Sequence, residues 1–247
     1  MSEASGGFDL HHVEQELDVW GLLGKTWDLG GSLGPIPLEL NVKTLLMTWI
    51  TMLLVILFLM AATRNLSLRK PGKLQVVVEL LHDFLKGLAF DNIGARKAAP
   101  LMALILTLFI YLLFSNLWGL VPTMSSSTAD LNTTIGMALI VFLLLWYQGF
   151  KYKGGGHLKH FIKPFPVFLP INLVEEVARP VTLAFRLYGN IYAGEVLIAV
   201  LLGLLGFGSF LPSVIWLAFS IFVGFIQAFI FTMLTIAYVS SVVAEHH

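Results

Sequence analysis

Two charged side chains precede a long apolar stretch, and they are the first candidates for chemistry in this chain. Arg186 and Glu195 are followed by residues 196–244, which contain no Asp, Glu, Lys or Arg. A charged side chain at the centre of a bilayer costs roughly 2.5–3.5 kcal/mol on insertion scales, so it normally faces a cavity or a partner. On one helix these two residues lie on opposite faces, about 13 Å apart along the axis, so they do not pair with each other.

Other polar residues of the same helix are ordered by depth. Asn190 follows Arg186 by one turn on the same face, while Glu175 and Glu176 lie toward the end opposite to Glu195. Carboxylates therefore reach in from both sides, and a fixed cation lies between them. This order is that of two half-channels, one open to each side of the membrane, with a block in the middle.

The last apolar helix adds two polar side chains, Gln227 near its middle and Ser220 nearer to the outer side. A buried amide needs a hydrogen-bonding partner. If the last two helices are antiparallel, Gln227 falls at about the depth of Arg186, and Ser220 lies on the same side as Glu195. Three further residues either join this outer set or shape the outer loop: Asn116, Asp130 and Asn132.

Arginine is suited to block a proton path, because its pKa is above about 12 and it keeps its proton at any relevant pH. Each elementary charge is worth about 2.3 kcal/mol per 100 mV. A continuous proton wire would dissipate this energy, whereas a detour through a moving carboxylate would convert it. The pattern therefore indicates ion translocation, and the alternative for Arg186 is a structural ion pair with another helix.

The other candidates also have structural alternatives. Glu175 can pair with Arg179 four positions later, which makes Glu176 the preferred pathway residue. Glu195 can be a carboxyl kept neutral by burial. Gln227 can make an interhelical hydrogen bond, worth about 0.6 kcal/mol on average.

The composition requires a membrane. Of 247 residues, 57% are hydrophobic and 12% are charged, against roughly 25% charged in soluble domains. The net charge is zero and cysteine is absent, so we expect no nucleic-acid partner and no thiolate chemistry. No histidine spacing suggests a metal site, and we predict neither a metal nor a cofactor. The N-terminus lacks a basic start followed by an apolar run, so no cleavable signal peptide is expected.

We predict an all-α integral membrane protein with five transmembrane helices and one interfacial amphipathic helix, since a spanning helix needs about 20 mostly apolar residues. The uncharged run 196–244 is too long for one crossing and is interrupted by Gly and Pro, so it belongs to two helices. The expected segments are an outer N-terminal segment 1–43; transmembrane helices 44–63, 98–121 and 131–150; an amphipathic helix 73–91; a basic loop 151–169; two long helices 171–206 and 212–241; and a tail 242–247.

Lys and Arg mark cytoplasmic loops, and they gather in residues 64–73, 86–97 and 151–163. With five crossings, all three groups fall on one side of the membrane. This predicts an outer N-terminus and a cytoplasmic C-terminus in a multi-pass protein. Helix 73–91 carries apolar residues on one face and polar residues on the other, as expected at a membrane surface.

Three motifs resemble the subunit a family of F-type ATP synthases. Residues Arg186 to Glu195 read RLYGNIYAGE and resemble the family's core motif. QAFIF at Gln227–Phe231 and DLNTT at Asp130–Thr134 are further matches in the expected order and spacing. The resemblance covers nearly the whole chain from about Leu38 onward.

The resemblance implies the stator proton-channel subunit of a rotary ATP synthase, whose two offset half-channels couple proton flow to c-ring rotation and so to ATP synthesis or hydrolysis. Arg186 would be the essential cation facing the c-ring carboxylate. The last two helices would form a long, tilted hairpin against the ring. The implied outer half-channel comprises Asn190, Glu195, Gln227 and Ser220, and the inner one Glu176 and Glu175.

Further implications concern location and partners. Some family members carry a His where this chain has Ser220, so no histidine relay is expected there. Residues Tyr192 to Glu195 are more similar to bacterial members, which favours a bacterial plasma (inner) membrane. The implied partners are the c-ring, the peripheral-stalk subunit b, the lipid bilayer and translocated H⁺, with Na⁺ as the alternative ion. The chain lacks a phosphate-binding loop, so we expect no enzymatic activity on its own.

Other functions are less consistent with the sequence. A stand-alone secondary transporter, the main alternative, would show paired repeats with broken helices at matching positions, and none is found. An intramembrane hydrolase would need a metal-binding, serine-nucleophile or paired-aspartate motif within the spans, and these are also absent. A purely structural subunit would give Arg186 and Glu195 no purpose inside a bilayer.

Overall fold

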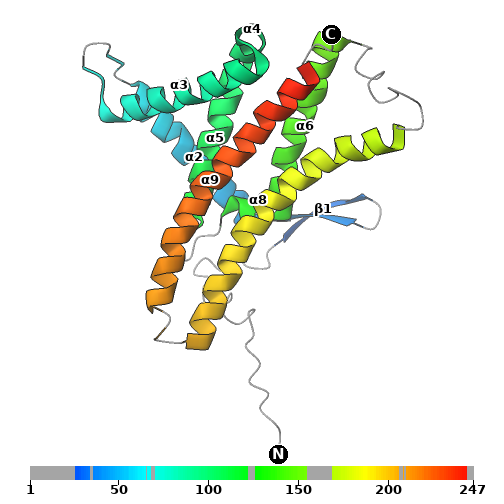
Figure 1. Cartoon of the computed structure of the whole chain (residues 1–247). Helices are drawn as coiled ribbons and strands as arrows, with labels where there is room; N and C mark the ends of the chain where they lie inside the picture. The colour runs from blue at the N-terminus through cyan, green and yellow to red at the C-terminus, as the bar shows by residue number, and fades with distance from the viewer. Residues whose placement is uncertain are drawn as a thin grey trace, which may run out of the picture.

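The computed structural model describes residues 26–33, 36–64, 66–67, 70–121, 126–154, 169–205, 208 and 210–243. These residues are mostly helical (Figure 1), which confirms the predicted all-α membrane fold class. The helices are α2 (Val42–Thr63), α3 (Lys73–Ile93), α4 (Ala95–Ala98), η1 (Ala99–Leu101), α5 (Met102–Trp118), η2 (Ser127–Ala129), α6 (Leu131–Lys153), α8 (Leu169–Leu205) and α9 (Phe210–Val243).

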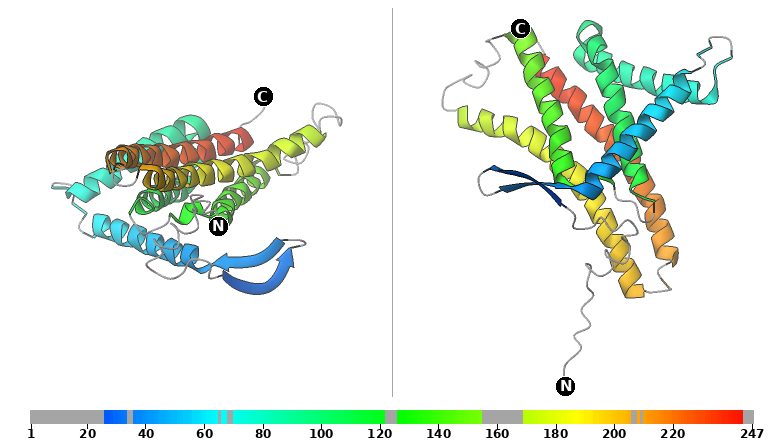
Figure 2. Two further views of the ribbon diagram at one scale, coloured as in Figure 1. Left: turned by 90° about the horizontal axis from the view of Figure 1, so that it is seen from below. Right: turned by 180° about the vertical axis from the view of Figure 1, so that it is seen from behind.

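An antiparallel β-hairpin precedes α2, which the sequence analysis did not predict. It pairs β1 (Thr26–Leu33) with β2 (Ile36–Asn41), and its register is irregular between Asp28 and Ser32. The pair Gly30–Gly31 lies in this interval, and glycine in a strand often marks such an irregularity. The hairpin lies to one side of the helices, next to the start of α2 (Figure 2).

Four helical stretches among the described residues are long and apolar enough to cross a membrane: Val42–Thr63, Ala95–Trp118, Leu131–Lys153 and Phe210–Val243. The long helix α8 is not one of them, and it carries five charged residues between Glu175 and Glu195. A fifth crossing, by α8, therefore stays a prediction.

Several helix ends differ from the expected boundaries. The segment 98–121 was expected as one helix, but a 3-10 turn surrounds Pro100 and α5 ends at Trp118. Proline has no N–H for the helical hydrogen bond, which explains the tighter turn. Helices α8 and α9 each begin two residues earlier than expected. Within the N-terminal segment, the basic loop and the tail, residues 1–25, 155–168 and 244–247 lie outside the described part.

The helices pack as a bundle with α8 and α9 side by side on one face (Figures 1 and 2). Buried side chains of α5, α6 and α9 dominate the core, including Phe109, Leu145 and Phe231. The joined ends of α8 and α9 extend past the ends of the other helices (Figure 1). Helix α2 packs at the edge, where its exposed apolar residues, among them Trp49 and Met60, suit a lipid environment.

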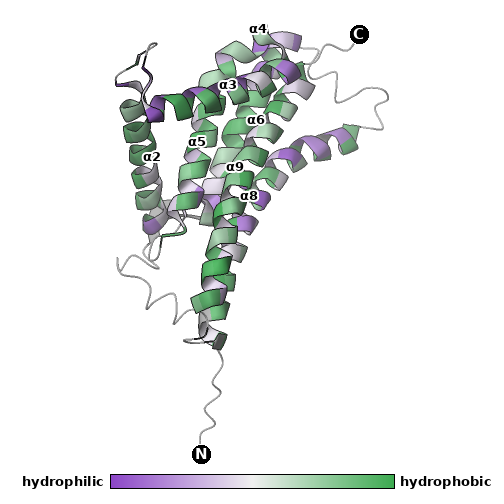
Figure 3. Ribbon diagram, turned by 60° about the vertical axis from the view of Figure 1, so that its left-hand side comes forward, coloured by the Kyte–Doolittle hydropathy of each residue, from purple (hydrophilic) through white to green (hydrophobic). Residues whose placement is uncertain are grey.

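Basic residues of different segments meet at one end of the bundle. The Lys97 Nζ donates a hydrogen bond to the Val243 carbonyl oxygen at 3.1 Å, and it lies 5.4 Å from the centre of the Tyr152 ring. The end of α9, the end of α6 and helix α4 therefore share one side. Hydrophilic residues also gather at this end in Figure 3, along α3, α4 and the first half of α8.

Candidate functional site

Contacts at two levels show that α8 and α9 form an antiparallel hairpin. Near its tip, the Trp216 Nε1 donates to the Gly194 carbonyl oxygen at 3.3 Å. Near its base, the Arg179 guanidinium lies 5.6 Å from the centre of the Tyr238 ring. Counting residues along both helices between these two contacts places Gln227 of α9 beside the part of α8 between Arg186 and Asn190.

Arg186 lies about halfway along α8 and its side chain is exposed. Among the described residues it has no hydrogen-bonding or ion-pair partner. Its surroundings on the outer face of α8 are apolar: Val181 is 45% exposed and Phe185 is 56% exposed. If α8 crosses the membrane, a permanently charged guanidinium on this apolar surface needs an external partner, because charge in such surroundings is costly.

The residues assigned to the outer half-channel lie at different levels of the hairpin. Asn190 is half-buried one turn after Arg186. Gln227 is buried on α9, and its Nε2 has no hydrogen-bond acceptor in the described part of the chain. Ser220 is half-buried, and its Oγ would lie 3.9 Å from a Cβ added at Gly194. Ser220 is thus close to the backbone next to Glu195, whose own side chain lies outside the described residues.

The two adjacent glutamates differ in their surroundings. The Glu175 carboxylate is 62% exposed and makes a 2.9 Å salt bridge with the Arg179 guanidinium. The Glu176 side chain is only 9% exposed, and its Oε2 lies 3.6 Å from the same guanidinium. The Glu176 Oε1 is buried without a hydrogen-bond donor among the described residues. The anticipated pairing of Glu175 with Arg179 is present, and Glu176 lies against the same guanidinium.

Asn116 and Asp130 have structural contacts. The Asn116 Nδ2 donates to the Gly224 carbonyl oxygen of α9 at 3.0 Å. Asp130 caps α6 by accepting from the Asn132 N–H at 2.8 Å, and it accepts from the Thr44 hydroxyl at 2.9 Å. These residues hold α5, α6, α9 and α2 together, which favours the interpretation that they shape the outer loop.

Sequence reasoning missed a buried hydroxyl cluster beside Asn116. Ser115 and Ser127 are 2.6 Å apart, and Ser126 and Thr128 are 2.7 Å apart. The Thr128 hydroxyl also donates to the Asn116 Oδ1 at 3.2 Å. The polar run at residues 125–128 predicts an exposed loop, but mutual hydrogen bonding allows these side chains to be buried.

The same reasoning missed that Arg179 bridges two helices, since besides its glutamates it contacts Tyr238 and lies 3.5 Å from the Ser241 Oγ. The described residues contain no group of three His, Cys, Asp or Glu side chains that could hold a metal ion.

Comparison with known proteins identifies the family. The family model described as ATP synthase A chain matches residues 45–240. The chain belongs to the ATP synthase A chain family. It is 55% identical to the ATP synthase subunit a of Desulforamulus reducens over 96% of this chain and 94% of that protein. The subunits a of Bacillus pumilus and Bacillus subtilis are each 38% identical, over 85% of this chain and 95% of theirs.

Membership in the ATP synthase A chain family confirms the resemblance inferred from the three motifs. The match begins at residue 45, close to the start of α2, so it includes every helix of the bundle. The β1–β2 hairpin lies outside the family model, although the alignment to the Desulforamulus protein covers 96% of this chain.

Proposed function

We propose that this chain is the stator proton-channel subunit of a rotary F-type ATP synthase, located in a bacterial plasma membrane. Its curated relatives carry the name ATP synthase subunit a, which does not favour the stand-alone transporter. In this proposal the chain works with a c-ring and a peripheral-stalk subunit b, and catalysis of ATP chemistry belongs to other subunits.

The observation that carries the proposal is Arg186, an exposed cation without a described partner on the apolar outer face of α8. A c-ring carboxylate passing this face would supply the missing negative charge. Attraction between the two charges is strong in low-dielectric surroundings, so the arginine would hold the carboxylate ionised while it passes. Because arginine itself does not release a proton, it separates the two half-channels.

The proton path follows from this separation. A proton enters from outside past Glu195, Asn190, Gln227 and Ser220 and neutralises a ring carboxylate, which can then face lipid. After nearly a full rotation the carboxyl group loses its proton to the inner pathway at Glu176, with Glu175 beside it. The ionised carboxylate then passes Arg186, and the cycle runs in reverse when ATP hydrolysis drives it.

Arg186→Ala in the whole complex tests the proposal. In inverted vesicles, ATP-driven proton pumping should fall to the background level. Arg96→Ala is the matched control, because Arg96 is an exposed arginine on α4 outside the hairpin, and it should pump like the wild type. Fully coupled pumping by Arg186→Ala, in a complex of normal subunit composition, would refute the proposal and leave Arg186 a structural residue.

A further inference from the structure

Glu176 has two oxygen atoms that lack the partners a helix normally provides. Its side-chain Oε1 is buried and has no donor among the described residues. Its main-chain carbonyl would accept from the N–H four positions later, but that position is Pro180, inside α8, and proline has no N–H. Buried polar atoms are nearly always satisfied by protein or water. The buried Oε1 therefore indicates a place for a proton and for the water that exchanges it.

Arg179 lies next to the Glu176 carboxylate and contacts residues of both α8 and α9. On α8, its Nη2 lies 2.9 Å from the exposed Glu175 and its Nη1 lies 3.6 Å from the Glu176 Oε2. On α9, its Nη1 is 3.5 Å from the Ser241 Oγ, and its Cζ lies 5.6 Å from the centre of the Tyr238 ring. A guanidinium held by four groups in this way has little freedom to swing away from Glu176.

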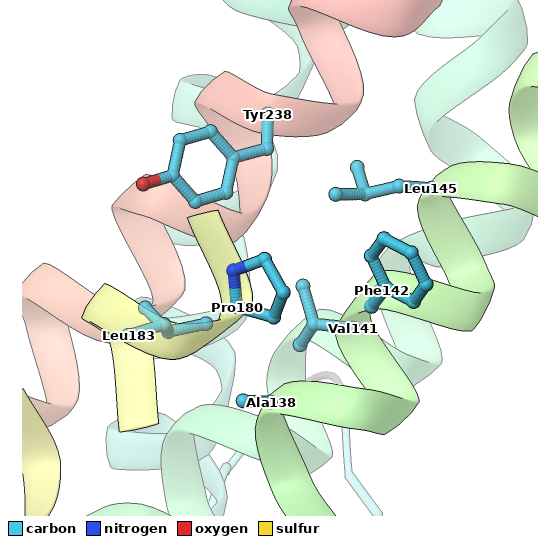
Figure 4. A pocket seen from close by; sticks show the side chains of 7 residues that line it. All are labelled: Ala138, Val141, Phe142, Leu145, Pro180, Leu183 and Tyr238. Atoms are coloured by element: carbon cyan, nitrogen blue, oxygen red, sulfur yellow. The ribbon is translucent and has the colours of Figure 1, made fainter. Parts of the chain in front are cut away.

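Tyr238 gives the guanidinium a rigid support. Its ring borders a closely packed apolar seam where α6, α8 and α9 meet, opposite Val141 and Leu145 of α6 and beside Pro180 and Leu183 of α8 (Figure 4). Helix α8 bends along its length (Figure 1), and an internal proline is a common cause of bending. The residues that pack around Tyr238 therefore also support the surface on which the Arg179 guanidinium lies.

Few other charges act on Glu176. Helix α9 has no charged residue from Phe210 to Val243, and Tyr238 is its titratable group at this level. The residues of α6 at the seam are apolar, and its cations Lys151 and Lys153 lie in its last turn. Within the described residues, Arg179 is the only cation within 4.0 Å of the Glu176 carboxylate.

We propose that Arg179 is a positioning residue for proton release, which holds the Glu176 carboxylate by its Oε2 and leaves the buried Oε1 for water to reach. This inference rests on the proposed function. The ring carboxyl gives its proton to water as its O–H bond breaks, and that water passes a proton to the Glu176 Oε1, where an O–H bond forms. Water then removes that proton, and Glu176 returns to the carboxylate that Arg179 stabilises. Glu175, 62% exposed, forms a 2.9 Å salt bridge with Arg179 and balances its charge while Glu176 is protonated, so the two adjacent glutamates have divided roles.

The test is ATP synthesis by the whole complex in inverted vesicles, with the pH on the cytoplasmic side varied at constant proton-motive force. Arg179→Gln removes the only cation within 4.0 Å of the Glu176 carboxylate among the described residues, so proton release to the cytoplasmic side should slow. Arg179→Gln should therefore lower the rate several-fold near neutral pH and move the midpoint of the pH profile of the rate upward, because an opposite charge nearby favours a carboxylate. Arg179→Lys should restore the midpoint, and Glu175→Gln should move it downward.

Further variants make the outcome decisive. Combining Arg179→Gln with Glu176→Gln should give the profile of Glu176→Gln alone, because Arg179 acts through Glu176. An equal loss of rate at every pH, or additive effects in the double variant, would overturn the inference and leave Arg179 a structural link between α8 and α9. If Arg179→Gln fails to assemble, the midpoints of Arg179→Lys and Glu175→Gln still decide. Normal pumping by Arg186→Ala would instead refute the proposed function itself.

Discussion

Gly119→Ala should destabilise the chain because Gly119 lies in close contact with η2. A Cβ added at Gly119 would lie 2.4 Å from the Ser126 Cβ and 2.8 Å from the Ser126 Cα and N. The φ of Gly119 is −64°, a value that alanine adopts readily, so the conflict is with Ser126 alone. Ordinary contacts between carbon atoms need about 3.5 Å or more, so the Ser126 backbone must shift by about 1 Å.

The shift of Ser126 sets the size of the effect. Overpacking of this kind typically costs about 1–3 kcal/mol. Ser126 also donates to the Ser115 carbonyl oxygen at 3.0 Å and contacts the Thr128 hydroxyl at 2.7 Å. Losing these bonds adds about 0.6 kcal/mol each, the average for polar contacts within membranes. We therefore expect the free energy of unfolding to fall by about 2–4 kcal/mol.

The matched control, Gly136→Ala, should change the free energy of unfolding in the opposite direction. Nothing lies within 4 Å of a Cβ added at Gly136, which is inside α6. Gly136→Ala should therefore stabilise the helix by up to about 1 kcal/mol through helix propensity. The two variants can be compared by unfolding the purified chain in detergent, with the fluorescence of its six tryptophans as the signal. Equal unfolding free energies for the two variants would show that the contact between α5 and η2 does not constrain the fold.

Two further predictions concern the hairpin and the orientation. Gln227→Leu should leave stability unchanged or raised, because it removes a buried amide whose Nε2 lacks an acceptor, yet it should lower ATP-driven pumping several-fold. Lower stability together with unchanged pumping would instead make Gln227 structural. The chain has no cysteine, so single cysteines report topology directly. In inverted vesicles an impermeant maleimide should label Lys153→Cys and spare Thr26→Cys, and the reverse pattern would contradict the predicted orientation.

Much of the fold class could be predicted because bilayer crossing is a local property of sequence. An apolar run of about 20 residues identifies a spanning helix without knowledge of its neighbours. The β1–β2 hairpin was missed because Gly30 and Gly31 interrupt its first strand, which weakens the period of two. The break at Pro100 was missed because the run around it stays apolar while the backbone changes locally.

Part of the candidate site could also be selected from the sequence, because a charge within an apolar run is a local feature. Charges within apolar surroundings are conspicuous in sequence, so Arg186 and Glu176 could be selected directly. The partners of Arg179 could not be, since Ser241 is 62 positions away and the register of a long helical hairpin depends on packing along its whole length. The hydroxyl cluster at Ser115 and Thr128 was hidden because each residue alone resembles a loop residue.

The spacing along α8 explains why ion transfer would require a moving partner. Glu176 and Arg186 are ten positions apart in one helix, which is about 15 Å along the axis. No side chain spans that distance, and Arg186 passes no proton onward. A proton on Glu176 therefore cannot reach Asn190 through α8 itself. In the proposed function, the carrier is a ring carboxylate that arrives on the outer face of α8 beside Arg186, which is exposed and apolar.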